Sequence, residues 1–458
     1  MKSVLTAAEI RAAEAEYIAA NPSVDLMGRA AEHIANAALE MLGENRQVLV
    51  VAGPGNNGGD ALFAAAAIAK TGRRVRLWLA FERAHPAGLG AAQAAGCMTL
   101  SASNALERLP MVDLVIDGLT GIGGRAGLDS HVSTFAAACR MHKVPVLSID
   151  IPSGLDADSH QAADCFQATK TVTFAAKKLC HVARPAAQYC GEVVVADIGI
   201  VIPDASCWQV EISDLRRWWP KPDVMCDKYS RGVVGFDTGS DTYPGAAALG
   251  VLGALNTGVG MVRYFGDQPT TVLAVAPSVV CVSGRVQASV LGSGWADCDD
   301  DRLRAAASHG VPLVVDAQGL QSLPIDLPAG SVLTPHAGEL AQALDINRSQ
   351  VEEDPLFWVR KAAADFGVCV LLKGPSQYVA TPQGQVLIAL PGPAWSAQAG
   401  SGDVLAGSCG ALLATGVSSE RAAVMAASVQ ALAAAANPGP YPPDVIATKF
   451  PAVIASLD

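Results

Sequence analysis

Two glycine-rich segments of the sequence carry residue types that can hold anions and move protons. GPGNNGGD runs from Gly53 to Asp60, and AGSGD runs from Ala399 to Asp403. Each segment leads directly into an apolar, Ala-rich stretch that is typical of a helix. Glycine lets the backbone approach a ligand closely, and the free amides at a helix start attract negative charge. A carboxylate beside such amides is suited to general acid–base catalysis.

The first segment, residues 53–60, also satisfies the G-x-G-x-x-G pattern of dinucleotide-binding folds. Glu82, near the end of the next predicted strand, matches the ribose-binding acid of that pattern. The pair Asn56 and Asn57 is not part of the pattern, and its amide oxygens suit an alkali cation or hydroxyl groups. The alternative is an ordinary tight turn in which Asp60 interacts favourably with the helix dipole.

Two more predicted strands of the first half end on polar side chains. VIDGLTGIGGRAG ends a strand at Asp117, and LSIDIPSGLDAD ends one at Asp150, three residues before Ser153. Each aspartate alone is equally well explained as a turn or cap residue. In parallel sheets, however, ligands bind outside the carboxyl ends of the strands. The three polar loops together therefore predict one site.

The second half places polar residues at strand ends in the same way. VVDAQGL ends a strand at Asp316, TPHAGEL places His336 before a helix, and VLLKG ends a strand at Lys373. A lysine that ends an apolar strand must meet an anion or water. A lone histidine is more often structural, and AGSGD alone is equally an ordinary helix start. Together these residues suit phosphoryl transfer, in which Asp403 accepts a proton and helix amides stabilise the transferred group.

Short β-branched runs alternate with Ala-rich segments, which predicts a mostly parallel sheet with helices on both faces. In the first half we expect strands over 48–53, 75–81, 112–117, 144–150, 171–176 and 192–200, and helices over 60–71, 87–96 and 130–142. In the second half we expect strands in VVGFDTG, MVRYF, TVLAVAP, VPLVVDA and VCVLLKG, a hairpin turning at PQG, and two packed helices at the end. The uncharged stretch 243–262 contains five glycines and a proline, which favours a buried helix with a turn over a membrane span.

Residues 203–232 interrupt this alternation with prolines and charges, so we place a domain boundary near residue 212. The prediction is an α/β protein of two domains, residues 1–211 and 212–458.

The composition excludes several classes of protein. Of the 458 residues 51% are hydrophobic, which is too apolar for a disordered chain, and the net charge is −11. This acidity disfavours nucleic acids and anionic membranes as partners. The 11 cysteines form no C-x-x-C pair, which disfavours disulfide frameworks and structural zinc. Because the opening segment carries acids, we expect no secretory signal and a cytoplasmic location.

Over roughly residues 1–200 the sequence resembles the NAD(P)H-hydrate epimerase domain, through GPGNNGGD, VIDGLTGIGG, VLSIDIPSGLDAD and TVTFAAKKLCHVARPA. The resemblance implies a Rossmann-like three-layer sandwich and a K⁺ ion held by Asn57, Asp117 and Ser153. It implies that Asp150 lies at the substrate, where we assign it as the acid–base residue. The other substrate contacts that it implies are Asn56, Asn57, Gly58, Gly59, Asp60, Gly121, Ile122, Gly123, Gly124, Arg125, Ala126 and Gly127.

From about residue 226 to 450 the sequence resembles the NAD(P)H-hydrate dehydratase domain of the ribokinase-like superfamily. The motifs are DKYSRG, GSDTYPGAA, TPHAGE, LLKG and GSGDVLAG. The resemblance implies ADP as phosphoryl donor in bacterial-type enzymes and ATP in eukaryotic ones, with Mg²⁺, and a homo-oligomer. It implies Asp403 as the catalytic base and substrate contacts from Gly294 and His336. The nucleotide-binding residues that it implies are Lys373, Gly374, Gly400, Ser401 and Gly402.

The second half departs from the family pattern around its nucleotide loop. Residues 393–399 read PAWSAQA where N-P-G-M-A-T-G is usual, and residues 316–320 read DAQGL where D-A-D-A-L is usual. The G-P-G-L-G-like loop is Gly292-Ser-Gly-Trp295, and Pro277-Ser278 replaces the usual P-E. We expect these differences to change catalytic efficiency and the choice of nucleotide more than the fold.

The sequence therefore predicts a two-domain enzyme that repairs NADHX and NADPHX, the hydrated nicotinamide nucleotides. One alternative is a ribokinase-like small-molecule kinase with an accessory nucleotide-binding domain. Another is a nucleotide-binding protein with decayed sites, which the altered residues 393–399 and Gln318 favour. A dehydrogenase of the Rossmann type would leave the second half unexplained.

Overall fold

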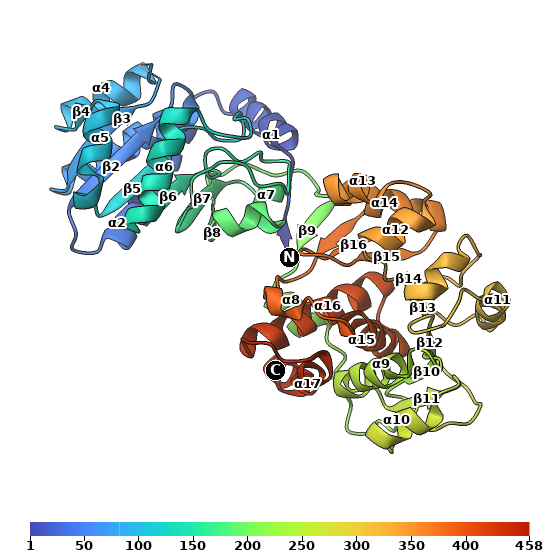
Figure 1. The fold of residues 1–458 in the computed structure, drawn as a ribbon. Helices are drawn as coiled ribbons and strands as arrows, with labels where there is room; N and C mark the ends of the chain where they lie inside the picture. The colour runs from blue at the N-terminus through green and yellow to red at the C-terminus, as the bar shows by residue number, and fades with distance from the viewer. Residues whose placement is uncertain (82, 458) are drawn as a thin grey trace. The chain divides into compact units, whose positions relative to one another are not determined.

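The computed structural model describes residues 1–81 and 83–457, so Glu82 of the dinucleotide pattern lies outside the described residues. The chain divides into two compact units (Figure 1). The first unit is Ser3–Ala205, and the second comprises Met1–Lys2 and Ser206–Asp458. Strand β9 (Cys207–Gln209) pairs with a strand of the second unit, so residues just before the expected boundary at 212 already belong to that unit.

The first unit is built on a parallel sheet, seven-stranded over the described residues, in the order β4-β3-β2-β5-β6-β7-β8. Its strands are β2 (Gln47–Ala52), β3 (Arg74–Leu79), β4 (Met98–Leu100), β5 (Leu114–Gly118), β6 (Val146–Ile149), β7 (Lys170–Phe174) and β8 (Glu192–Ala196). Its helices are α1 (Ala7–Ala20), α2 (Leu26–Leu42), α3 (Asn56–Lys70), α4 (Pro86–Ala94), α5 (Ala102–Arg108), α6 (Ser130–His142) and α7 (Leu179–Val182), with short 3₁₀ turns at Leu109–Met111 and Ala186–Tyr189.

Two hydrophobic cores cover the two faces of this sheet. Residues of α2 and α3, such as Ile34 and Leu62, share one core with Val50 of the central strand. Phe135 of α6 packs in the other core with Val51, the next residue of the same strand. Successive side chains of a strand point to opposite faces, so the strands are buried on both sides. The predicted three-layer sandwich is confirmed.

The second unit has a larger sheet, ten-stranded over the residues that the structure describes, in the order β1-β9-β17-β16-β15-β14-β13-β12-β10-β11. Its other strands are β1 (Lys2–Ser3), β10 (Val233–Asp237), β11 (Met261–Tyr264), β12 (Ala288–Leu291), β13 (Leu313–Val315), β14 (Val332–Leu333), β15 (Cys369–Leu372), β16 (Tyr378–Ala380) and β17 (Val386–Ile388). Its helices are α8 (Ile212–Trp218), α9 (Pro244–Thr257), α10 (Pro269–Val275), α11 (Asp300–Ser308), α12 (Ala337–Ala343), α13 (Arg348–Glu353), α14 (Pro355–Phe366), α15 (Ser401–Ala414), α16 (Ser419–Ala436), α17 (Pro443–Ala447) and α18 (Phe450–Ala455), with 3₁₀ turns at Ala317–Ser322 and Ala394–Ser396.

Most strand predictions of the second half are confirmed, including the hairpin β16–β17 that turns over residues 381–385. TVLAVAP, expected as a strand, instead lies mostly in α10, which begins at Pro269. A short apolar run has no periodicity that separates a buried strand from a helix, and proline at a first helical position favours the helix.

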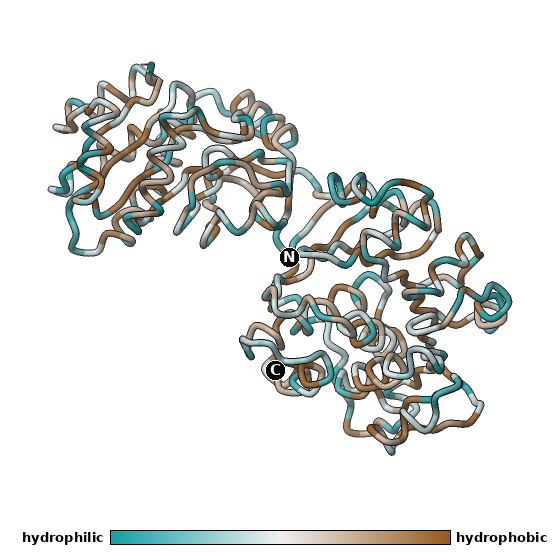
Figure 2. The backbone as a smooth tube through the Cα atoms, viewed as in Figure 1, coloured by the Kyte–Doolittle hydropathy of each residue, from teal (hydrophilic) through white to brown (hydrophobic). Residues whose placement is uncertain are grey.

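The uncharged stretch 243–262 forms the buried helix α9 and a turn at Gly258, as expected. Among the described residues, no helix has the length and apolar character that crossing a bilayer requires. In Figure 2 the hydrophobic residues concentrate along the strands of each sheet, where the cores lie.

Candidate active sites

The first candidate site lies at the carboxyl ends of β2, β5 and β6, where the three predicted loops meet. Helix α3 begins at Asn56 directly after the loop, and its N-cap residue, Gly55, has no side chain that could occupy the first-turn amides. Gly58 is buried so closely against this loop that an added Cβ would lie 2.0 Å from the carbonyl oxygen of Gly53. Glycine is therefore required for the short strand-to-helix connection that presents the first-turn amides.

Asp117 is fully buried at the end of β5, where four hydrogen-bond donors surround its carboxylate. Oδ1 accepts from the Ser153 hydroxyl at 2.6 Å and the Leu119 amide at 3.3 Å. Oδ2 accepts from the Ser153 amide at 2.8 Å and the Ser148 hydroxyl at 2.9 Å. Within the described part of the chain no ion pair involves Asp117, and burial raises its pKa despite these hydrogen bonds.

The three predicted K⁺ ligands lie around the loop that follows β5. Asp117 and Ser153 are in direct contact, and Thr120 donates its amide to the Ser153 hydroxyl at 3.0 Å. Asn57 Oδ1 lies 3.1 Å from the position of a Cβ added to Gly121 in the same loop. Among the described residues, the buried hydroxyl of Thr120 has no hydrogen-bond partner. A buried carboxylate without a cationic partner, with the hydroxyl oxygens of Ser148, Ser153 and Thr120 in the same place, fits a hard monovalent cation.

Asp150 follows β6 and has a φ of +67°, a conformation that is uncommon for residues other than glycine. Its Oδ1 accepts from Lys178 Nζ at 2.5 Å and Thr173 Oγ1 at 3.1 Å. Its Oδ2 accepts from the amide of Ile122 at 3.0 Å. Burial raises the pKa of Asp150, but the Lys178 ammonium and the hydrogen bonds outweigh burial and lower it below its usual value. Asp150 is therefore ionised at neutral pH.

Other carboxyl groups lie near Asp150, and sequence reasoning missed one of them. Burial, followed by the charges of Asp150, Glu14 and Asp25, raises the pKa of Asp60 to about 8. Burial and then Asp150 also raise the pKa of Glu14, which helix α1 contributes. An ionised Asp150 near a protonated Asp60 supplies a base and an acid to one site.

The loop 121–127 is only partly directed to this site. Gly121 lies beside the carboxylate of Asp150, and Arg11 Nη2 of α1 donates to the carbonyl oxygen of Ile122 at 2.7 Å. Arg125 is exposed and pairs with Asp129 instead. The remaining predicted contacts divide by exposure: Asn56, Gly123 and Ala126 are exposed, Gly124 and Gly127 are partly exposed, and Gly58 and Gly59 are buried.

The second candidate site lies at the start of α15. Gly400 is the N-cap, and Ser401, Gly402 and Asp403 form the first turn. Asp403 is partly exposed, and burial together with the charge of Asp316 raises its pKa to about 7. The altered loop 393–399 closes onto this turn, because Ser401 Oγ donates to the carbonyl oxygen of Ser396 at 2.8 Å.

Lys373 reaches this turn from the end of β15. A Cβ added to Gly402 would lie 3.3 Å from Lys373 Nζ. Nζ also donates to Asp316 Oδ1 at 2.7 Å and lies 3.6 Å from Glu339 Oε2. Asp316 and Glu339 raise the pKa of Lys373, although burial alone would lower it. The lysine predicted at the nucleotide is thus paired with carboxylates of this chain. From the sequence, Asp316 is predicted at a strand end without a role of its own, and Glu339 is not predicted in the site.

Hydrogen bonds from two hydroxyl groups, in addition to the one from Lys373, hold Asp316 at the end of β13. Its carboxylate also accepts from Ser293 Oγ and Thr334 Oγ1, each at 2.9 Å. Burial alone would raise the pKa of Asp316, but Lys373 and these hydrogen bonds lower it below the usual value. Asp316, Glu339 and Asp403 leave a surplus of negative charge around one lysine, which fits a divalent cation bound together with nucleotide phosphates.

The other predicted residues of the second site lie around this cluster. The side chain of His336 is 58% exposed and caps α12, because Nδ1 accepts from the Glu339 amide at 3.0 Å. A β-bridge joins His336 to Lys373. Gly294 is partly exposed, and an added Cβ would lie 2.4 Å from that of Ala246. Gly374 is exposed next to Lys373.

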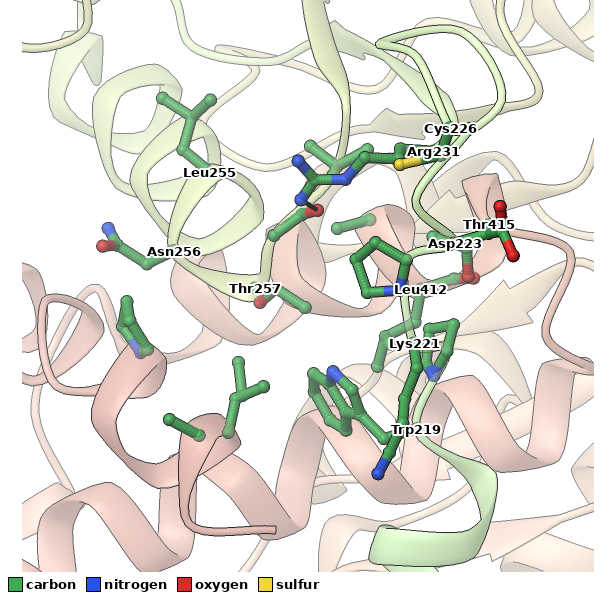
Figure 3. Close-up of a pocket in the computed structure, with 18 of the residues that line it drawn as sticks. Trp219, Lys221, Asp223, Cys226, Arg231, Leu255, Asn256, Thr257, Leu412 and Thr415 are labelled. Atoms are coloured by element: carbon green, nitrogen blue, oxygen red, sulfur yellow. Dashed lines mark hydrogen bonds between the residues drawn. The ribbon is translucent and has the colours of Figure 1, made fainter. Parts of the chain in front are cut away.

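A separate cavity of about 790 Å³ lies at the carboxyl-terminal ends of α9 and α15, away from the first turn of α15. Figure 3 shows its lining, which extends from Thr257 and Thr415 at the helix ends to Trp219 and Lys221 in the segment before β10. Over the residues that the structure describes, none of the predicted site residues lines this cavity. This cavity is therefore separate from the cluster of charged residues at the start of α15.

Known proteins resemble the chain over almost its whole length. It is 38% identical over 465 residues to the bifunctional NAD(P)H-hydrate repair enzyme Nnr of Mycobacterium leprae, with 96% of each chain covered. The chain belongs to the family of bifunctional NAD(P)H-hydrate repair enzymes. Nnr of Mycobacterium tuberculosis is 39% identical over 435 residues, covering 90% of this chain and 89% of that one. Nnr of Corynebacterium glutamicum is 31% identical over 511 residues, covering 90% and 87%.

Two family models match this repair enzyme, one in each unit. The model of the YjeF-related protein N-terminus matches residues 23–180, and the model of NAD(P)H-hydrate dehydratase matches residues 234–449. The first range includes Asp60, Asp117 and Asp150, and the second includes Asp316, Glu339 and Asp403. The chain is therefore an enzyme with an epimerase domain and a dehydratase domain, as predicted.

Solved structures confirm the fold of the second unit. The ADP/ATP-dependent NAD(P)H-hydrate dehydratase of Bacillus subtilis superposes with a TM-score of 0.51 and 20% identity, covering 54% of this chain and 98% of that one. A ribokinase-like superfamily protein of Enterococcus faecalis has a TM-score of 0.50 and 18% identity, covering 56% and 98%. The predicted ribokinase-like architecture is confirmed.

Proposed function

We propose that the first unit interconverts the R and S epimers of NAD(P)HX and that the second unit dehydrates the S epimer with ADP. NAD(P)HX is a reduced nicotinamide nucleotide that carries a hydroxyl group at ring carbon C6. The observation that carries the proposal is the near full-length match to bifunctional repair enzymes, in a chain that places a carboxylate at each of two glycine-lined loops. A dehydratase specific for one epimer would leave the other unrepaired, so joining the two activities is chemically sensible.

In the first site, Asp150 and Asp60 have the protonation states that epimer exchange requires. Asp150 is ionised and accepts the proton of the C6 hydroxyl, while protonated Asp60 donates a proton to the ring nitrogen. The bond between C6 and nitrogen then opens to an aldehyde, and reclosing on the other face returns both protons. Asn57, Asp117 and Ser153 would hold K⁺, whose charge fixes the loops and screens the substrate phosphates.

In the second site, Asp403 and the start of α15 act on the same hydroxyl group. Asp403 accepts the hydroxyl proton, and the amides of the first turn of α15 hold the negative charge that develops. The residues that we assign to the nucleotide are Lys373, Gly374, Gly400, Ser401 and Gly402. ADP would supply the phosphoryl group, with Mg²⁺ on its phosphates near Glu339. Phosphate then leaves C6 with the electrons of the C6–O bond, and a proton leaves C5 to the departing phosphate, which restores the ring double bond.

One experiment tests both halves of the proposal. Purified enzyme is mixed with both NADHX epimers and ADP, with ATP in a parallel reaction, and recovery of NADH is followed by absorbance. We expect complete recovery, and no recovery without nucleotide. Absence of NADH with either nucleotide contradicts the dehydratase. If NADH forms quickly only from the S epimer, and the rest follows at the slow rate of spontaneous exchange, the proposed epimerase activity of the first unit is contradicted.

Two further properties belong to the proposal. We expect a homo-oligomer, which light scattering after size-exclusion chromatography would detect as a multiple of the 46.9 kDa chain. We also expect a cytoplasmic enzyme, which cell fractionation would test.

A further inference from the structure

Lys178 is buried directly beside the proposed catalytic carboxylate of the first unit. Its side chain is 1% exposed and lies just before α7. Nζ lies 2.5 Å from Asp150 Oδ1, 2.6 Å from Thr173 Oγ1 and 3.3 Å from the carbonyl oxygen of Phe174. An ammonium group has three N–H donors, so these three acceptors use all of them. Lys178 therefore has no donor left for a substrate.

His181 fixes the backbone of the same aspartate. Its Nδ1 lies 3.0 Å from the amide of Lys178, which can only donate. Nδ1 is therefore unprotonated, and Nε2 carries the proton and donates to the carbonyl oxygen of Asp150 at 2.9 Å. Burial and then the charge of Lys178 lower the pKa of His181 to about 3, so the imidazole is neutral.

These two contacts hold the main chain and the side chain of Asp150. The bond from His181 holds the main chain, whose φ is +67°, and the ammonium of Lys178 holds Oδ1. Among the described residues, the other oxygen, Oδ2, accepts a hydrogen bond only from the Ile122 amide, and it lies 3.0 Å from the position of a Cβ added to Gly121. The free lone pair of the carboxylate thus belongs to Oδ2, on the side of the glycine loop.

We propose that Lys178 is a positioning residue that engages Oδ1 of Asp150 and so makes Oδ2 the atom that exchanges the proton with the substrate. This inference rests on the proposed epimerase activity. A side chain held in a precise orientation contributes to the rate step more than to substrate binding, because misplacement of about 1 Å can reduce a rate about 10²-fold.

The alternative explanation is that Lys178 only neutralises the buried carboxylate of Asp150 and stabilises the fold. Lys170 provides the matched control, because it lies on the neighbouring strand β7 and pairs with Glu40 at 3.0 Å and Glu192 at 3.4 Å. Its side chain is 11% exposed, and it makes no contact with Asp150 among the hydrogen bonds and ion pairs that the described residues form. Loss of Lys170 removes a buried cation of the same type without touching the proposed base.

The test compares Lys178→Met, Lys170→Met and wild type in the full-length enzyme. Steady-state exchange of purified R-NADHX into the S epimer is followed by chromatography, and kcat and KM are obtained separately. We expect kcat of Lys178→Met to fall about 10²-fold while KM stays within about threefold. We expect Lys170→Met to keep kcat within about threefold of wild type. Thermal unfolding of each variant shows whether the first unit is folded.

Thr173→Val is the second variant, because it keeps the shape of the side chain and removes the hydroxyl that bonds both Nζ and Oδ1. We expect its kcat to fall about tenfold with KM unchanged. If Lys178→Met does not fold, an unchanged kcat in Thr173→Val overturns the proposal. A folded Lys178→Met with wild-type kcat, or an equal loss in Lys170→Met, also overturns it. If wild type itself does not exchange the epimers, the proposed function has failed.

Discussion

Each candidate site contains a lysine bonded to an aspartate at the end of a strand, but the aspartate has a different proposed role in each site. In the first site Lys178 is bonded to the proposed catalytic residue, Asp150, at 2.5 Å. In the second site Lys373 is bonded at 2.7 Å to Asp316, which is not the proposed base. The pKa of Asp150 is consequently lowered, whereas burial and the charge of Asp316 raise that of Asp403 to about 7. Electrostatic partners therefore give the two bases different working ranges of pH.

Replacing the base of the second site should separate the two activities. In Asp403→Asn the amide cannot accept the hydroxyl proton, so we expect ADP-dependent dehydration of S-NADHX to fall about 10²–10⁴-fold. Exchange of the epimers should keep its wild-type rate, because Asp150 lies in the other unit. The measurement is the initial rate of NADH formation. The control is Asp365→Asn, an exposed aspartate paired with Lys361. Dehydration within threefold of wild type in Asp403→Asn would exclude Asp403 as the base.

The raised pKa of Asp403 also predicts a pH profile. Only the ionised carboxylate accepts a proton, so kcat/KM for dehydration should fall about tenfold per pH unit below about pH 7 and level off above it. This ratio reports the pKa of the base in the free enzyme. Exchange of the epimers should stay constant between about pH 5.5 and 7, since the pKa of Asp150 is lowered. A dehydration profile that is flat down to pH 5 would show that the base has an ordinary carboxylate pKa.

At the scale of elements, the strand ends and helix starts could be predicted because their signals are local. Glycine-rich segments before apolar helices identified the loops that contain Asn57 and Asp403, and a polar residue at the end of an apolar strand identified Asp150. The structure places each at a strand or helix end. The partners of these residues could not be predicted, because they come from distant parts of the sequence. Lys178 reaches Asp150 across 28 residues, and Glu14 reaches the same site from α1. Such pairs are set by packing of elements and leave no periodic signal in one sequence.

The second site depends on how α15 packs against α9. A Cβ added to Gly407 of α15 would lie 1.9 Å from the carbonyl oxygen of Gly250 in α9. A buried hydrogen bond of 2.7 Å between Thr257 and Ser408 joins the same two helices. Their separation therefore fixes where the first turn of α15, with Asp403, lies relative to the loop that begins α9.

Gly407→Ala should force these helices apart. We expect a loss of about 1–3 kcal/mol in the free energy of unfolding, the usual range for an overpacked core, together with slower dehydration. The matched control is Gly245→Ala in α9, where an added Cβ meets open space. Denaturation followed by tryptophan fluorescence suits this measurement, because six of the seven tryptophans lie after residue 205 and report the second unit. Equal stability of Gly407→Ala and Gly245→Ala would contradict the close contact.

At the scale of the whole molecule, the chain is two compact units with separate sheets and separate cores. One core of the first unit contains Ile34 and Leu62, and the core of the second contains Phe236 and Leu405. Each unit places its own carboxylate at its own strand ends. Since the residues that we assign to each site lie within one unit, we expect NADHX to leave the first site before the second acts on it.

This separation predicts that two damaged chains can complement each other through solution. In the presence of ADP, the Asp150→Asn variant should repair only the S epimer of an NADHX mixture. The Asp403→Asn variant should produce almost no NADH. An equimolar mixture of the two variants should recover the whole, because the intact first unit of one chain supplies S-NADHX to the intact second unit of the other. NADH absorbance measures the yield, and the double variant Asp150→Asn/Asp403→Asn is the control. Recovery no greater than that of Asp150→Asn alone would mean that the substrate passes between sites only within one molecule.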